Sequence, residues 1–115
     1  MEPKGDVVVA EEPAGVAPVD VDPIIHAVSR LRIMTALVSL DPDVSIAFSR
    51  LRALLDMTPG NLLAQVQTLA AAGYVRLVQE GRGRNSRTSI SVTTTGREAY
   101  AQYAHAIRAL LGSPA

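Results

Sequence analysis

The fold of this 115-residue chain is decided by residues 48–92, FSRLRALLDMTPGNLLAQVQTLAAAGYVRLVQEGRGRNSRTSISV. Leucines at helical spacing predict a short helix over residues 50–56, with Ser49 as its N-cap. Thr58 and Pro59 then combine a favoured N-cap with a residue suited to a first helical turn, and Gly73 can end the helix that they open. The stretch predicts two helices joined by a tight turn.

A β-hairpin is expected directly after the second helix. Residues 74–80 and 89–93 alternate apolar and polar side chains, as strands do. Between them lies an eight-residue loop that holds two glycines and three arginines. Glycine lets the backbone approach a phosphate closely, and arginine binds phosphates or enters a narrow minor groove. The pattern predicts a helix-turn-helix followed by a basic wing, an arrangement that grips duplex DNA.

The second helix carries an uncharged polar face opposite Leu62, Val66 and Leu69, which should turn inward. Asparagine and glutamine can bond the N6 and N7 atoms of adenine in the major groove. A polar helix face that meets only water is the alternative. The residues expected to face DNA from this helix and its turn are Thr58, Gly60, Asn61, Ala64, Gln65, Gln67 and Thr68. The wing and backbone contacts expected are Arg76, Arg82, Arg84, Asn85, Ser86, Arg87, Arg50 and Arg52, although arginines on a helix are often only solvated.

The flanking segments should complete one domain. Asp22-Pro23 predicts the start of a long helix that ends before Pro42, and residues 44–48 alternate like a short edge strand. Thr95 to Glu98 matches a capping box, so a last helix is expected from about Gly96 to Leu111.

The first and the last predicted helix both carry more apolar residues than one buried face needs, which suggests a second protomer. Tyr100, Tyr103, Ile107 and Leu110 form a seam with 3-4-3 spacing. Packing of this seam on the first helix of the same chain is the alternative. The residues expected in a homodimer interface are Ile24, Ile25, Val28, Tyr100, Tyr103, Ile107, Leu110 and Leu111.

The charge is divided unevenly along the chain, although the formal net charge is zero. Residues 1–22 hold six acids and one base, whereas the remainder holds ten arginines and five acids. A basic body suits a polyanionic partner. Residues 1–21, with their prolines and acids, are predicted to be a disordered tail, residues 22–111 the folded domain and residues 112–115 a short tail.

Several functions are disfavoured by composition. The chain lacks cysteine, which excludes disulfides and thiolate sites and suits a reducing cytoplasm. No stretch reaches the roughly 20 apolar residues of a membrane span, and the N-terminus does not match a signal peptide. His26 and His105 lie on different predicted helices without a nucleophile, so we expect neither an enzyme nor a metal site, and no cofactor.

The order of these elements resembles small bacterial winged-helix regulators of the MarR/ArsR kind over residues 22–111. The stretches that carry the resemblance are Asp22-Pro23-Ile24-Ile25-His26, Arg30-Leu31-Arg32-Ile33-Met34, Gly60-Asn61-Leu62, residues 69–75 (LAAAGYV) and residues 93–97 (TTTGR). The resemblance implies a mainly α fold with a small β-hairpin (α+β) and an additional C-terminal dimerisation helix. It also implies a homodimeric repressor, with DNA-reading roles for Asn61, Gln65, Gln67 and Thr68. The chain departs from such relatives in lacking basic or histidine residues on that face.

The sequence therefore favours a cytoplasmic transcriptional regulator that joins the nucleoid when it binds double-stranded DNA. Two alternatives stay open. One is a winged helix that binds a protein partner, which would show little salt-dependent affinity for DNA. The other is a regulator that responds to an unidentified small apolar effector between the first and last helices, where the sequence shows no polar group to orient one.

Overall fold

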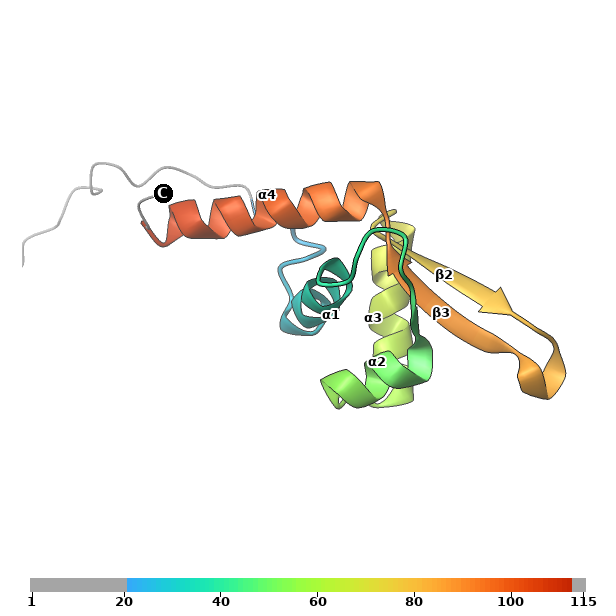
Figure 1. The fold of residues 1–115 in the computed structure, drawn as a ribbon. Coiled ribbons are helices and arrows are strands. Elements are labelled where there is room, and N and C mark those ends of the chain that lie inside the picture. The colour runs from blue at the N-terminus through green and yellow to red at the C-terminus, as the bar shows by residue number, and fades with distance from the viewer. Residues whose placement is uncertain (1–20, 113–115) are drawn as a thin grey trace, which may run out of the picture.

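The computed structural model describes residues 21–112, which form four helices and a three-stranded antiparallel sheet (Figure 1). The elements are α1 (Val28–Val38), β1 (Ile46–Ala47), α2 (Phe48–Leu55), α3 (Pro59–Ala71), β2 (Val75–Glu80), a 3-10 turn (Gly83–Asn85), β3 (Arg87–Val92) and α4 (Thr94–Leu110). The predicted α+β winged helix-turn-helix is confirmed. Of the two predicted tails, only Val21 and Gly112 lie within the described residues.

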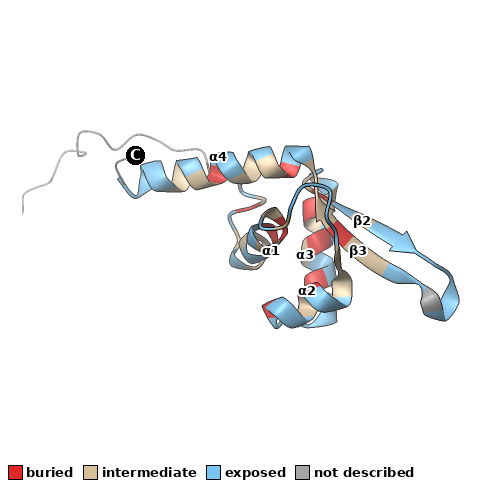
Figure 2. Cartoon of the chain, viewed as in Figure 1, coloured by how far each residue is buried: buried red, intermediate tan, exposed pale blue. Residues whose placement is uncertain are grey.

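The core lies where α1, α3 and the base of the sheet meet, beneath α4 (Figure 2). Leu62, Val66 and Leu69 of α3 are fully buried, as their spacing predicted. They pack with Ile33, Met34 and Leu37 of α1, Leu51 of α2 and Ile90 of β3. Figure 2 shows that exposure rises toward the tip of the hairpin and toward the C-terminal end of α4.

The first helix begins five residues later than the Asp22-Pro23 signal predicted. Asp22 instead forms a turn, in which its Oδ1 accepts a hydrogen bond from the backbone N of Ile24 at 2.8 Å. Ala27 is extended, and α1 begins at Val28. The reason is tertiary: the turn buries Ile25 completely and brings the other carboxylate oxygen of Asp22 to the hydroxyl of Tyr74 at 2.5 Å.

The Tyr74 hydroxyl is held in its protonated form by that contact. The hydrogen bond to Asp22, partial burial and the carboxylate charge together raise the pKa of Tyr74 to about 12. Because this folded-state pKa lies above the ordinary value of 10.0, the contact is fully present at neutral pH and is lost only as the pH rises toward about 12. The bond therefore ties the N-terminal turn to the start of the wing at physiological pH.

Three other boundaries differ from the sequence predictions. The strand expected over residues 44–48 contains only Ile46 and Ala47, because these two residues alone pair with β3. α2 begins at Phe48, so Ser49 lies inside the helix and does not cap it. α4 begins at Thr94, because Thr93 rather than Thr95 is its N-cap.

The end of α3 and the start of α4 meet at Gly73 and Tyr74. Gly73 adopts a φ of 82°, and the backbone N atoms of Gly73 and Tyr74 bond Ala70 O and Leu69 O, which closes the helix in a Schellman motif. Thr93 then bonds this turn twice, from its backbone N to Tyr74 O at 3.0 Å and from its hydroxyl to Gly73 O at 2.6 Å. The same hydroxyl accepts the Gly96 N–H at 2.9 Å. The two helices are thereby joined through one threonine.

The sheet has the strand order β1-β3-β2, so β3 is central and β2 forms one edge. β2 and β3 pair from Val75 and Val92 at the base to Glu80 and Arg87 near the tip. Val75 and Ile90 are buried, whereas the far half of the hairpin stands in solvent. The hairpin is thus anchored at one end only, as a wing is.

Gly96→Ala is expected to destabilise the fold strongly. A Cβ at this position would lie well inside contact distance of the Tyr74 carbonyl oxygen and 2.9 Å from Cγ2 of Val92. Overpacking of this kind costs about 1–3 kcal/mol, which urea unfolding followed by circular dichroism can measure. Gly60→Ala is the matched control, because Gly60 also lies in a first helical turn and its Cβ would meet nothing within 4 Å. An unchanged unfolding midpoint for Gly96→Ala would contradict this account of the junction.

Candidate nucleic-acid interface

The recognition helix α3 is positioned at both of its ends. At the start, Thr58 is the N-cap, and its hydroxyl accepts the Asn61 N–H at 3.2 Å. Pro59 follows in the first turn. At the other end, the Schellman motif at Gly73 aims the chain into β2. The sequence signals for these two boundaries are confirmed, and they fix the helix beside the wing (Figure 1).

One flank of α3 faces α1 and is already engaged in hydrogen bonds. Arg30 of α1 donates from Nη1 to Oε1 of Gln65 at 2.9 Å and from Nε to the Ile24 carbonyl at 2.5 Å. Gln65 in turn donates to Oδ1 of Asn61 at 3.2 Å. Thr68, on the same flank, donates to the Ala64 carbonyl at 3.2 Å. Gln65 and Thr68 are half-buried, so their predicted role in base reading competes with contacts inside the protein.

The outward side of α3 carries Gly60, Ala64 and Gln67, all of which are exposed. Among these, Gln67 alone has a side chain with both hydrogen-bond donors and an acceptor. Within residues 21–112, that amide has no hydrogen-bond partner. Gln67 is therefore the polar side chain of the predicted reading face that is most available to another molecule.

The wing presents its arginines to solvent. Arg82, Arg84 and Arg87 are exposed, and Ser86 closes the 3-10 turn by donating its N–H to Gly83 O at 3.1 Å. Gly81 and Gly83 adopt positive φ angles of 85° and 56°, which lets the loop turn so tightly. Asn85 contributes backbone to this turn, and its side chain lies outside what the structure describes.

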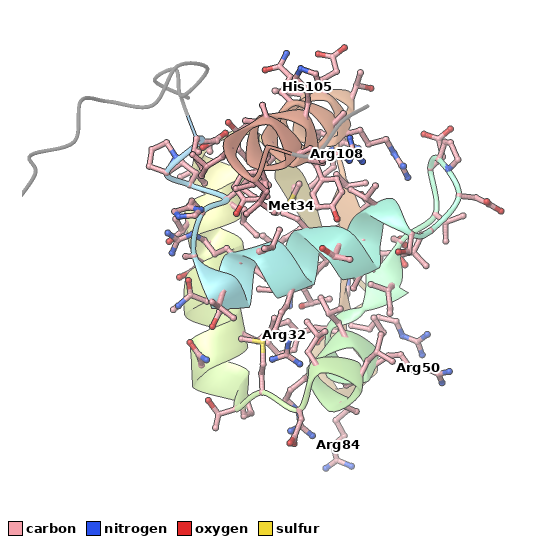
Figure 3. The ribbon with its side chains drawn as sticks, turned by 90° about the vertical axis from the view of Figure 1, so that its left-hand side faces the viewer. Arg32, Met34, Arg50, Arg84, His105 and Arg108 are labelled. Atoms are coloured by element: carbon pink, nitrogen blue, oxygen red, sulfur yellow. The ribbon has the colours of Figure 1, made fainter. Side chains whose placement is uncertain are left out.

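Arg76 and Arg50 extend this basic surface. Arg76 is exposed on the outer side of β2, opposite Ser91. Arg50 is exposed on α2, and in Figure 3 both Arg50 and Arg84 lie in the lower part of the view, whereas Arg108 lies in the upper part. The wing and α2 thus each present an exposed arginine to solvent.

Arg52 does not belong to this outward set, contrary to the sequence prediction. Its Nη1 lies 3.4 Å from the carbonyl oxygen of Met57, just beyond the end of its own helix, and the residue is half-buried. Its guanidinium therefore bonds a carbonyl in the turn between α2 and α3.

Two further arginines, which the sequence did not single out, bond the ends of neighbouring helices. Arg32 donates to Leu55 O at 2.7 Å at the end of α2. Arg97 donates to Val38 O at 3.2 Å and to Leu40 O at 2.8 Å after α1. Positive charge at a helix C-terminus is favourable, because carbonyl groups there are left without partners. No local sequence pattern marks such pairs, since the partners lie on different elements.

The predicted dimer residues divide into two groups. Ile25 is 0% exposed and Tyr103 is 7% exposed within a single chain, so these two belong to the protomer's own core, which corrects the prediction. The Tyr103 hydroxyl also lies 2.9 Å from Nδ1 of His26. Tyr100 packs inward as well, with its hydroxyl 2.9 Å from Oγ1 of Thr35.

In the other group, three of the predicted residues remain exposed at the surface. Val28, Leu110 and Leu111 are 77%, 54% and 76% exposed, and Ile24 and Ile107 are partly buried against the core. Figure 1 shows α4 continuing past the helices beneath it, so that its final turns stand alone. An open hollow of about 210 Å³ lies between α1 and α4, smaller than the roughly 300–1,000 Å³ of typical ligand pockets.

Other kinds of site find no support in residues 21–112. This part of the chain holds no cluster of three or more potential metal ligands. None of its helices is long and apolar enough to cross a membrane. Figure 3 shows His105 on the side of α4 that faces away from α1, whereas His26 bonds Tyr103.

A recognition helix capped at both ends, a short helix that supports it and a one-ended basic hairpin define a winged helix-turn-helix protein. The chain belongs to the winged helix DNA-binding domain family, which matches residues 29–111. That family is named for binding DNA and not for a catalysed reaction.

Comparison with solved structures agrees with this assignment. The chain is similar to a structure described as the transcriptional regulator homologue protein from Pyrococcus horikoshii OT3, with a TM-score of 0.68 and 28% identity over 77% of this chain and 85% of that chain. It shares its fold with disulfide-formed AbfR, with a TM-score of 0.58 and 15% identity over 75% of this chain and 54% of that chain. No curated protein matches the sequence.

The two glutamines on α3 should respond differently to replacement. Gln65→Ala removes the partner of Arg30, and a lost hydrogen bond of this kind costs about 1 kcal/mol of unfolding free energy. Gln67→Ala should change that free energy by no more than about 0.5 kcal/mol, as expected of an exposed residue. Urea unfolding of both variants makes the comparison. Equal stability of the two variants would show that the Arg30–Gln65 bond contributes nothing.

Proposed function

We propose that this protein is a sequence-specific repressor of transcription, which binds double-stranded DNA as a homodimer in the cytoplasm. One observation carries the proposal: Gln67 on α3 and Arg82, Arg84 and Arg87 of the wing are all exposed, whereas Arg32 and Arg97 bond carbonyl groups at the ends of helices. Such a surface offers hydrogen bonds to bases and positive charge to phosphates. The similarity to a structure described as a transcriptional regulator homologue supports it.

In the proposed complex, α3 enters the major groove and the wing lies on the backbone or in the adjacent minor groove. Gln67 would bond a base edge, while Arg82, Arg84 and Arg87 neutralise phosphates. Arg50 on α2 and Arg76 on β2, which are both exposed, would add contacts to phosphates. Repression needs no further machinery, because a protein that occupies its site excludes others from the same DNA.

The homodimer is proposed to form through the exposed ends of α1 and α4. Val28, Leu110 and Leu111 expose large apolar side chains, and burial of such surface is the main driving force of association. A twofold dimer would present two copies of α3 about one helical turn of DNA apart. This arrangement predicts a palindromic operator.

Arg84→Ala should weaken binding to all DNA sequences alike. A dimer with roughly three or four phosphate contacts per protomer has an expected slope of about −6 for log affinity against log salt, and loss of one contact per protomer should make it shallower by about 2. Fluorescence anisotropy with a labelled duplex, at several salt concentrations, measures both quantities. Arg108→Ala, which removes an exposed arginine near the opposite side of the molecule, should leave the slope unchanged.

Negligible binding to every duplex by the folded wild-type protein would argue against DNA as the partner. The same outcome would favour the alternative in which this surface binds a protein. A slope that stays the same in Arg84→Ala, with strong binding retained, would instead remove the wing from the contact surface.

Replacement of both Leu110 and Leu111 by glutamate should give a monomer. The two charges would have to be buried in the proposed interface, which is costly without partners. Sedimentation velocity should report the monomer mass, and affinity for a palindromic duplex should fall on the order of 100-fold as bivalent contact is lost. Ala101→Glu is the control, because Ala101 is also exposed on α4 but lies away from the seam of Tyr103 and Ile107. A dimer that survives the double replacement would place the interface elsewhere.

A further inference from the structure

An apolar hollow lies between the recognition helix and the wing. Its volume is about 390 Å³, and it is lined by Phe48, Leu63, Leu77, Gln79 and Thr88. A second open hollow of about 480 Å³ shares Phe48 and Thr88 with the first and includes Arg87 in its lining. The first hollow borders α3 through Leu63, and the second lies between α2 and the wing.

Leu63 is the residue of α3 that this hollow leaves accessible. It is 41% exposed, although its neighbour Leu62 is completely buried. Successive residues of a helix are turned by about 100°, so Leu63 lies on the flank of α3 opposite the one that Gln65 turns toward α1. The exposed part of the Leu63 side chain does not pack in the core, and this apolar surface is available to a partner.

The surroundings of the hollow favour DNA as that partner. Arg87 lines the adjoining hollow, so an exposed guanidinium lies near the apolar surface. Positive charge beside an apolar patch complements DNA, in which phosphates flank a groove that contains an apolar group. In the major groove that apolar group is the C5-methyl of thymine, which apolar side chains contact.

We propose that Leu63 is a specificity-determining residue, which contacts the methyl group of a thymine in the major groove. Gln67 lies one turn further along α3, at i+4 from Leu63, so the two side chains meet the same edge of the DNA. A glutamine amide pairs with adenine through N6 and N7. Leu63 and Gln67 together select A·T pairs in each half-site. This inference rests on the proposed function and adds to it the base that the site prefers.

The test compares thymine with deoxyuridine, which differs only in lacking the methyl group. The full chain is first used to select binding sites from a randomised duplex library. Each thymine of the selected half-site is then replaced singly by deoxyuridine, and affinities are measured by fluorescence anisotropy. One position should weaken wild-type binding about fourfold, the factor that corresponds to about 0.8 kcal/mol for one methyl-sized group. At that position Leu63→Ala should bind both duplexes equally.

Leu54→Ala is the matched control, because Leu54 is 63% exposed on α2 and does not line the hollow. It should keep the fourfold preference for thymine. If sites are selected but deoxyuridine weakens binding nowhere, or if Leu63→Ala keeps the preference, the role of Leu63 is overturned while the DNA-binding proposal stands. If the folded protein selects no sites, the proposed function and this inference both fail. The comparison of thymine with deoxyuridine in the wild-type protein tests for the methyl contact even if Leu63→Ala does not fold.

Discussion

The whole architecture depends on the close approach of α4 to the turn that ends α3. At Gly96 the first turn of α4 lies so near the Tyr74 carbonyl that no side chain fits between them. Thr93 bonds the same turn through its backbone and its hydroxyl. Because β2 begins at the next residue after Tyr74, this junction sets the angle of the wing against α3 and carries α4 across the core. A binding surface made from separate elements needs such a rigid point of reference.

Arginine serves two purposes in this fold, and geometry separates them. Arg30, Arg32, Arg52 and Arg97 donate to carbonyl or amide oxygens at the ends and flanks of helices. They take the place of main-chain and capping contacts that short helices leave open. The wing arginines make no such hydrogen bonds among the described residues and face solvent. Net charge alone therefore says little about binding, since part of it is committed to structure.

Most of the fold followed from local sequence, because local rules govern it. Thr58-Pro59 and Gly73 mark the ends of α3, and buried Leu62, Val66 and Leu69 follow helical spacing. The errors arose where distant partners decide the outcome. Asp22-Pro23 makes a turn because Tyr74, far along the chain, binds the carboxylate.

The candidate site was predictable in outline and less so in detail. The wing arginines were visible as a basic loop, and the structure places them, exposed, at the tip of the hairpin that follows α3. The commitment of Gln65 to Arg30 and the exposure of Leu63 depend on which flank of α3 meets α1, and helical spacing alone does not give that direction.

The edge position of β2 has one more consequence, for solubility. Its free backbone groups could pair with another chain and aggregate. Arg76 and Glu80 place charge along this edge, and such charges oppose pairing with the edge of a neighbouring molecule.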